Sequence, residues 1–288
     1  MKQKIVIGCA NFGNWYGLIK KKKNLKSVKS LVGLAIKNKI THFDTAQDYK
    51  SSEKILGKVI QENNQTKFIV DTKLTKFLGK IDEAKIEHKI RESLNKLNIK
   101  KINILYIHEP NQLQGRQGKN IFAVLLKLQK KKLFKYIGVS VYSISETKQI
   151  LKKFPVNIIQ APVNILDRRF LDFKLIKLIK KRKAKLIARS IFLKGILLKN
   201  SKKLSEKMKA FESVQKSLNN YARKNKTDKT TICFAYVLKI KFISNVIVGI
   251  ANSKQLKKLI KISKSRQNLR KFITPHIANK KLLDPRYW

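Results

Sequence analysis

The chain has 288 residues, 43% of them hydrophobic and 8% aromatic, which is enough for a large buried core and excludes a wholly disordered chain. Two cysteines exclude a disulfide scaffold, and no apolar run approaches the roughly 20 residues that a membrane-spanning helix needs. Lys and Arg number 67 against 17 acidic residues, and the net charge of +50 points to an anionic ligand or to a compositional bias of the surface.

Short apolar runs alternate with amphipathic helical patterns along the whole chain. Runs of this length are typical of strands buried on both faces of a parallel sheet. The predicted strands are Ile5–Cys9, Thr41–Ala46, Phe68–Leu74, Ile102–His108, Tyr136–Val141, Asn157–Val163, Lys185–Ser190 and Asn245–Ala251. The predicted helices are Val28–Asn38, Ser52–Glu62, Ile81–Leu97, Phe122–Leu133, Ile144–Phe154, Phe173–Arg182 and Gln255–Ser263, with two more in Ser205–Leu238 that are separated near Thr227–Asp228.

Eight strands that alternate with helices predict an α/β fold, a (β/α)8 TIM barrel forming one domain over residues 1–288. A doubly wound open sheet is the alternative. It is disfavoured because no Gly-x-Gly-x-x-Gly sequence follows any predicted strand, so the usual dinucleotide fingerprint is missing. We expect residues 271–288 to form a C-terminal tail near the pocket.

Charged or titratable side chains stand near the ends of three consecutive predicted strands, namely Asp44, Lys73 and His108. In such a barrel, the chemistry lies at the C-terminal ends of the strands. Side-chain alternation puts Asp44 on the same face as His42, and Lys73 on the same face as Asp71. If this face is the barrel interior, Lys73 pairs with Asp44, because a buried lysine needs an acidic partner.

Tyr49 follows Asp44 by five residues, in the loop before the next helix. An ammonium group beside this phenol stabilises the phenolate and lowers the Tyr49 pKa, which suits a general acid. His108 can hydrogen-bond the same oxygen and orient a carbonyl. The group fits protonation of an oxyanion while a nicotinamide cofactor delivers hydride. Each side chain alone has a structural explanation, such as a helix cap, but their coincidence on neighbouring strands favours chemistry.

Three segments resemble the aldo/keto reductase superfamily: Phe43–Gly57, with its Asp-Thr-Ala, Tyr and Ser-Glu motifs, Asp71–Lys73, and Leu105–Pro110. The resemblance implies a (β/α)8 barrel that reduces carbonyls with NAD(P)H. It also implies a catalytic tetrad, in which the proton donor is Tyr49, the modulator of its pKa is Lys73, the partner of that lysine is Asp44, and the substrate orienter is His108.

The resemblance continues through the rest of the chain, and the first segment and the ending are similar to a bacterial branch often linked to surface-sugar metabolism. The matching segments are Gly8–Gly13, Ile137–Ser140, Gln160–Asn164, Ala188–Ser190, Val248–Ala251 and Asp284–Trp288. The implied cofactor is NADPH, with NADH as the alternative. The residues implied to bind it are Cys9, Asp44, Ser140, Gln160, Arg189, Ser190, Gly249 and Gln255.

Some positions depart from the family pattern. Arg189 stands where many relatives carry an aromatic residue that stacks on nicotinamide, so its guanidinium either stacks there or contacts phosphate. Val141 replaces a frequent Asn, and Lys50 replaces the usual Gly after the tyrosine. Gln255 stands where some relatives place an Arg on the adenosine half. These changes leave the choice between NADPH and NADH open.

Aromatic residues are the candidate substrate contacts, because Trp and Tyr can stack on a sugar ring or an aromatic aldehyde. The candidates are Trp15, Tyr16 and Trp288, with Asn111–Asn120, Phe192–Leu198 and Tyr287 as further pocket candidates. The sequence therefore predicts a cytoplasmic NAD(P)H-dependent oxidoreductase that reduces a small aldehyde or ketone, such as a keto-sugar. No membrane or metal is expected, and the even spread of lysines disfavours nucleic acid.

Two alternatives remain open. The first is a nicotinamide-binding regulatory protein without turnover, which the intact tetrad disfavours. The second is a polyanion-binding protein, which the net charge of +50 suggests. No feature of the sequence indicates the oligomeric state.

Overall fold

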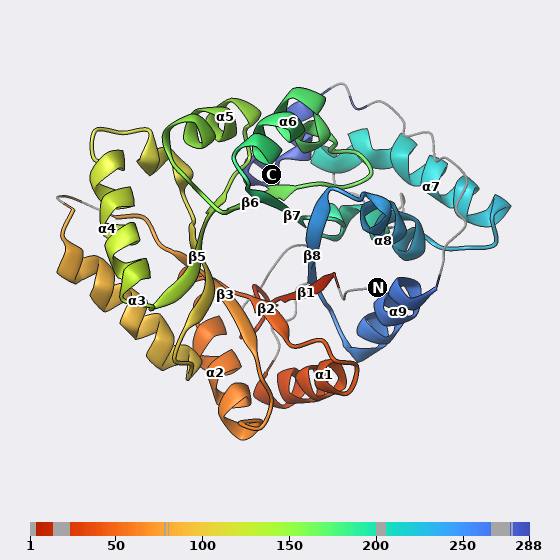
Figure 1. Ribbon diagram of the computed structural model, residues 1–288. Helices are drawn as coiled ribbons and strands as arrows, with labels where there is room; N and C mark the ends of the chain where they lie inside the picture. The colour runs from red at the N-terminus through yellow and green to blue at the C-terminus, as the bar shows by residue number, and fades with distance from the viewer. Residues whose placement is uncertain are drawn as a thin grey trace.

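The structure is a computed structural model that describes residues 4–13, 24–77, 79, 81–199, 206–265, 277 and 279–288. Within these residues, eight parallel strands close into a barrel in the order of the sequence, and helices surround it (Figure 1). The predicted (β/α)8 barrel is confirmed, and the doubly wound sheet is excluded because β8 pairs with β1 along four residue positions.

All eight predicted strands are present, close to their expected bounds. They are β1 (Ile5–Gly8), β2 (His42–Asp44), β3 (Ile69–Leu74), β4 (Ile102–Ile107), β5 (Phe134–Ser140), β6 (Ile158–Pro162), β7 (Lys185–Arg189) and β8 (Ile243–Gly249). Most of their residues are buried on both faces, as the near-continuous apolar runs predict.

The predicted helices are also present. They are α1 (Leu25–Lys37), α2 (Ser52–Glu62), α3 (Glu83–Leu97), α4 (Gly118–Lys130), α5 (Ile144–Lys153), α6 (Phe173–Lys181), α7 (Glu212–Lys224), α8 (Lys229–Lys239) and α9 (Ser253–Lys264). The expected break between α7 and α8 is confirmed, because the carboxylate of Asp228 caps α8 by accepting from the backbone N–H of Thr230 at 2.9 Å.

Helix α4 begins four residues earlier than its apolar pattern predicts. The sequence pattern starts α4 at Phe122, whereas the helix begins at Gly118. A Cβ at position 118 would lie 2.1 Å from the carbonyl oxygen of Leu113. The close approach to η1 (Pro110–Leu113), a short 3-10 helix, is a tertiary contact that periodicity does not encode.

The barrel interior contains a small apolar cluster and two polar groups. The apolar cluster consists of Val6, Ile104, Tyr106, Ile158, Ile187 and Ile247. One polar group joins Asp71 to His42 and Asn103, each through a 2.7 Å contact with a carboxylate oxygen. The other contains Asp44 and Lys73. The interior face expected from strand alternation therefore exists.

The described part of the C-terminal tail lies against the loop after β7. It forms two short 3-10 helices, η6 (Lys280–Leu283) and η7 (Pro285–Tyr287). The ammonium of Lys194 donates to the carbonyl oxygen of Pro285 at 3.1 Å, which ties the tail to η3 (Leu193–Leu198).

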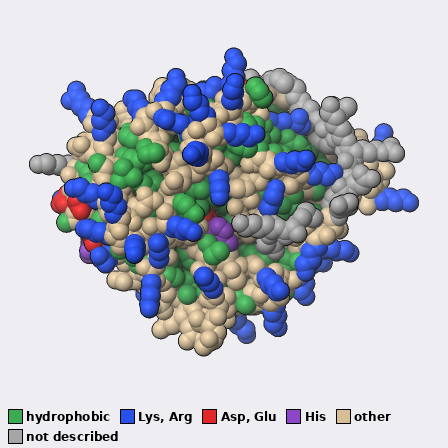
Figure 2. All heavy atoms as spheres, in the orientation of Figure 1, with side chains coloured by type: hydrophobic (Ala, Val, Ile, Leu, Met, Phe, Trp, Pro, Cys, Tyr) green, Lys and Arg blue, Asp and Glu red, His purple; other side chains and the backbone are tan. Residues whose placement is uncertain are grey.

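Lysine and arginine side chains are scattered over the face shown in Figure 2, where acidic side chains are few. Among the residues that the structure describes, no helix combines the length and apolarity required to cross a membrane.

Candidate active site

Lys73 and Asp44 form an ion pair inside the barrel, near the C-terminal ends of β3 and β2. The Nζ of Lys73 lies 2.6 Å from Oδ1 of Asp44 and also donates to the carbonyl oxygen of Thr45 at 2.7 Å. Lys73 is only 1% exposed, so its charge needs this partner. The Nε2 of Gln160 donates to the other carboxylate oxygen of Asp44 at 2.9 Å. The pairing expected from strand alternation is present.

Tyr49 lies in the loop between β2 and α2, which several hydrogen bonds hold in place. Its backbone N–H donates to the carbonyl of Ala46 at 3.1 Å, and its own carbonyl accepts from the N–H of Ser52 at 2.9 Å. The hydroxyl of Ser52 donates to the carbonyl of Cys9 at 2.8 Å and so anchors the start of α2 beside β1. In this loop, the Tyr49 ring centroid lies 5.1 Å from the Nζ of Lys73.

The phenol of Tyr49 is less acidic than the sequence suggests. Burial raises the pKa of Tyr49 and the carboxylate of Asp44 raises it further, whereas the guanidinium of Arg189 lowers it. The predicted lowering of this pKa is wrong in direction, because burial disfavours the phenolate and the carboxylate of Asp44 adds to that effect. Tyr49 therefore stays protonated at neutral pH, which is the state a proton donor needs.

His108 follows β4 and lies beside the phenol. Its ring meets the ring of Tyr49 edge to face, with 5.9 Å between centroids. Its Nδ1 lies 2.8 Å from Oδ2 of Asp48, and because a carboxylate only accepts, Nδ1 is the donor. Burial and the charge of Lys73 lower the pKa of His108, although Asp48 acts in the opposite direction. The imidazole is therefore neutral at pH 7.

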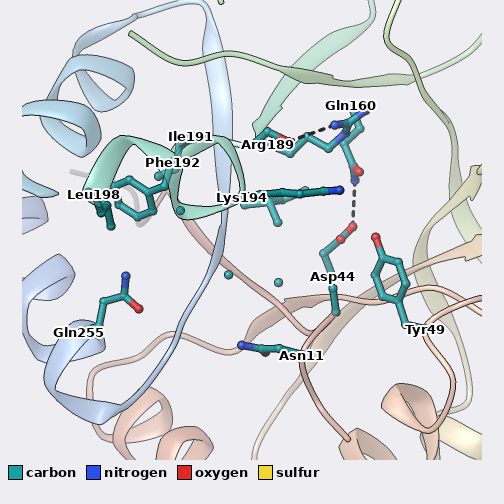
Figure 3. Close-up of a pocket in the computed structure, with 16 residues that line it drawn as sticks. Asn11, Asp44, Tyr49, Gln160, Arg189, Ile191, Phe192, Lys194, Leu198 and Gln255 are labelled. Carbon is teal, nitrogen blue, oxygen red and sulfur yellow. Dashed lines mark hydrogen bonds between the residues drawn. The ribbon is translucent and has the colours of Figure 1, made fainter. Parts of the chain in front are cut away.

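A pocket opens beside Asp44 and Tyr49 at the C-terminal ends of the strands (Figure 3). In this view, Tyr49 lies at one end and Gln255, from the first turn of α9, lies at the other. Arg189 and Lys194 extend into the region between them. The pocket suits an elongated ligand whose reacting end lies beside the phenol.

The model of the Aldo/keto reductase family matches residues 4–271 of this chain. The chain belongs to the aldo/keto reductase family. It is similar to aldo-keto reductase YhdN of Bacillus subtilis (strain 168), with 27% identity over 165 residues, 54% of this chain and 48% of that protein. It is also similar to methylglyoxal reductase DkgB of Yersinia pestis, with 27% identity over 137 residues, 45% of this chain and 50% of that protein. The chain thus spans about half the length of the curated relatives it matches.

The fold is likewise similar to that of a solved aldo/keto reductase. The holo form of aldo-keto reductase AKR11C1 from Bacillus halodurans has a TM-score of 0.72 and 19% identity, covering 91% of this chain and 87% of that one. The resemblance inferred from the sequence motifs is therefore confirmed for family and for fold.

Most of the residues that the family resemblance implies as cofactor contacts line the pocket. Those that do so are Asp44, Gln160, Arg189, Ser190, Gly249 and Gln255. Ser140 does not belong to the lining, but it is the strand neighbour of Gln160 and is 4% exposed.

Cys9 does not face the pocket. Its side chain is fully buried in the outer core, and its thiol donates to the carbonyl oxygen of Ile7 at 3.5 Å. Its neighbours Gly8 and Ala10 line the pocket instead, because successive residues at the end of β1 point to opposite faces.

The aromatic substrate candidates do not line the pocket within the described residues. Trp15 and Tyr16 lie outside those residues, and Tyr287 is 67% exposed. Trp288 donates from Nε1 to the carbonyl of Leu282 at 3.1 Å and packs edge to face on Phe211. Its ring centroid lies 5.8 Å from the Nζ of Lys194, which lines the pocket.

Only one of the two loops predicted to line the pocket contributes residues to its lining. Asn111–Asn120 contributes no residue to the pocket lining, and its Gln112 instead accepts from the backbone N–H of Phe77 at 2.7 Å. Phe192–Leu198 contributes four lining residues, namely Phe192, Lys194, Gly195 and Leu198.

Three residues near the site were not singled out from the sequence. Asn11 is 4% exposed and lines the pocket, Asp48 holds His108, and Tyr142 packs against Arg189. Asn11 lies in the glycine-containing segment after the first strand, and that position could have marked it. The other two act through partners from distant strands, for which the sequence carries no signal.

Proposed function

We propose that this chain is an NAD(P)H-dependent oxidoreductase that reduces an aldehyde or ketone to an alcohol. The observation that carries the proposal is the buried ion pair of Lys73 and Asp44, 2.6 Å apart, with the protonated phenol of Tyr49 next to it at the pocket. Burying an ion pair costs free energy. Here the pair has a use, because the ammonium of Lys73 can stabilise the phenolate that forms when Tyr49 donates its proton.

The pocket fits a nicotinamide cofactor. Two buried acceptor atoms belong to residues of its wall, Oδ1 of Asn11 and Oε1 of Gln160, and neither has a hydrogen-bond partner among the described residues. Each could accept a hydrogen bond from the carboxamide N–H of a nicotinamide. A Cβ on Gly195 or Gly249 would meet no atom within 4 Å, so bare backbone borders open space there. We infer that these residues hold the cofactor together with Arg189. When bound, it supplies the hydride.

We infer that the cofactor is NADPH, with NADH as the alternative. Gln255 marks the end of the pocket away from Tyr49 (Figure 3). Near the start of the same helix are Lys254 and Lys257, and its first turn carries no acid. The positive end of a helix dipole with nearby lysines favours phosphate. The extra phosphate of NADPH suits that end.

The proposed chemistry assigns one task to each tetrad residue. The carbonyl carbon gains the hydride, and its oxygen gains the proton as the O–H bond of Tyr49 breaks. Lys73 stabilises the resulting phenolate until solvent returns a proton, and Asp44 keeps the ammonium in position. His108 is neutral and its one N–H is held by Asp48 at 2.8 Å, so its Nε2 acts only as an acceptor and the ring positions the carbonyl by packing beside the phenol.

The substitution Tyr49→Phe tests this proposal, because it removes the proton donor and keeps the ring. We expect aldehyde reduction, followed as loss of NADPH absorbance, to fall by at least about 100-fold. The dissociation constants of NADPH and NADH and the urea unfolding curve should stay near those of the wild type. Tyr136→Phe is the matched control, because Tyr136 lies near the start of β5, away from the pocket. Unchanged reduction by Tyr49→Phe would contradict the assignment.

The substrate is proposed as a small carbonyl compound, and aldehydes and keto-sugars form the set to screen. The same screen tests the alternative of a regulatory protein without turnover. That alternative requires cofactor binding with no carbonyl reduced across the set. The protonated phenol beside the Lys73–Asp44 pair favours turnover.

A further inference from the structure

Arg189 forms part of a stack of three side chains at the edge of the pocket. Its guanidinium carbon lies 3.9 Å from the ring centroid of Tyr142, and that of Arg286 lies 3.8 Å from the same centroid. Arg286 comes from the C-terminal tail, where it donates to both carboxylate oxygens of Asp284, at 2.6 Å in the shorter contact. The stack holds the guanidinium of Arg189 against a rigid ring.

The two arginines differ in how their charges are balanced. The charge of Arg286 is balanced by Asp284, whereas Arg189 donates only to neutral groups, the hydroxyl of Ser190 at 3.2 Å and the carbonyl of Val141 at 3.1 Å. The described part of the chain offers Arg189 no carboxylate within ion-pair distance. Asp44, the acid that lines the pocket, is already paired with a lysine. Arg189 therefore gives the pocket wall an uncompensated positive charge.

This charge lies close enough to the reacting end of the pocket to act on the phenol of Tyr49. Arg189 ends β7 and lines the pocket together with Tyr49 and Gln160. Its charge also acts on the phenol, where it opposes the effect of burial on the pKa of Tyr49. A hydride donor must reach the carbonyl whose oxygen meets Tyr49. The redox-active ring of the cofactor would therefore lie near Arg189.

The two redox forms of nicotinamide differ in charge at this ring, because the reduced ring is neutral and the oxidised ring is cationic. We propose that Arg189 makes the pocket select the reduced cofactor and repel the oxidised one, which biases the protein towards carbonyl reduction. The inference rests on the proposed function. Repulsion between two unit charges a few ångströms apart is substantial at a partly desolvated site. Because it acts on one redox form only, it shifts the equilibrium between the bound forms.

The charge difference predicts a specific pattern of affinities. We expect the wild type to bind NADPH at least about tenfold more tightly than NADP+, which corresponds to about 1.4 kcal/mol. Arg189→Gln removes the charge but retains hydrogen-bond donors. It should tighten NADP+ binding and so bring the ratio of the NADP+ and NADPH dissociation constants towards one. Arg189→Lys is the matched control, because it retains the charge and should retain most of the ratio.

Isothermal titration calorimetry with each form of the cofactor measures these ratios without turnover. The same titrations with NADH and NAD+ extend the test to the other cofactor. A ratio in Arg189→Gln equal to that of the wild type would overturn the inference. So would an equal weakening of both forms, which is the behaviour of a phosphate contact. The wild-type ratio is an independent test that needs no variant, because a value near one overturns the inference by itself.

The outcomes separate this inference from the proposed function. If the wild type binds no nicotinamide cofactor in either redox state, the proposed function and the inference fail together. If it binds the cofactor and reduces carbonyls but does not distinguish the redox forms, only the inference fails. Tyr49→Phe should lose reduction yet keep the wild-type ratio, because the ratio depends on charge at Arg189 and not on the proton donor.

Discussion

The interior ion pair illustrates how much one residue depends on its partner. Lys73 is 1% exposed and its ammonium donates to a carboxylate and to a backbone carbonyl, so its charge is balanced within the protein. Removing one member leaves the other charged, buried and unpaired, which costs far more than the pair contributes. The stability of the barrel therefore depends on Asp44 and Lys73 as a unit.

Lys73→Met should lower the free energy of unfolding by about 3–5 kcal/mol, because it leaves the carboxylate of Asp44 buried without a cation. The double substitution Asp44→Asn with Lys73→Met removes both charges and should recover part of this loss. Equilibrium unfolding in urea at neutral pH measures both values. A double variant less stable than Lys73→Met would contradict this account of the pair.

At the scale of elements, α2 and α3 pack closely because of one glycine. A Cβ at Gly57 would lie 2.0 Å from the carbonyl oxygen of Lys96, in the last turn of α3. A backbone atom cannot move aside as a flexible side chain can. The glycine in the Ser-Glu…Leu-Gly motif therefore sets the distance between two helices, and α2 in turn follows the loop that carries Tyr49.

Gly57→Ala should destabilise the protein by about 1–3 kcal/mol through this overlap. Gly33→Ala is the matched control, because Gly33 lies within α1 and a Cβ there would meet no atom within 4 Å. It should stabilise the protein by about 0.5–1 kcal/mol through higher helix propensity. Urea unfolding of both variants tests the opposite signs. Equal effects would mean that helix propensity, and not the α2–α3 contact, decides the outcome.

At the scale of the whole molecule, 67 basic side chains against 17 acidic ones must repel one another. The basic side chains are scattered over the face in Figure 2 and form no single cluster there. On this face, the scatter fits a general surface bias better than a dedicated nucleic-acid site, which gathers basic side chains into a patch or stripe. Binding of polyanions remains the alternative prediction from the charge.

Screening should therefore stabilise the protein. We expect the midpoint of thermal unfolding to rise as salt increases from about 0.01 M to about 0.15 M, because the screening length falls from about 30 Å to about 8 Å. Differential scanning calorimetry in sodium chloride and sodium fluoride at matched ionic strength measures the effect and separates screening from binding of one anion. A midpoint that stays constant or falls would mean that self-repulsion does not limit stability.

The sequence by itself determined the features that follow local rules. Apolar runs separated by amphipathic helices predicted every strand of the barrel, and Asp228 marked the start of α8. Alternation along two strands predicted that Asp44 and Lys73 share the interior, since side chains in a strand have a period of two. The family motifs predicted Tyr49 as a site residue because they lie within one continuous segment.

Only the tertiary structure decided the features that depend on distant partners or on burial. It revealed that Cys9 faces the core, that Asp48 holds His108, and that burial raises the pKa of Tyr49 although a lysine lies beside it. It also brought Arg286 from the tail to the ring that supports Arg189. The physical reason is that periodicity reports only neighbours along the chain. Charge balance and desolvation depend on what the fold places around a group.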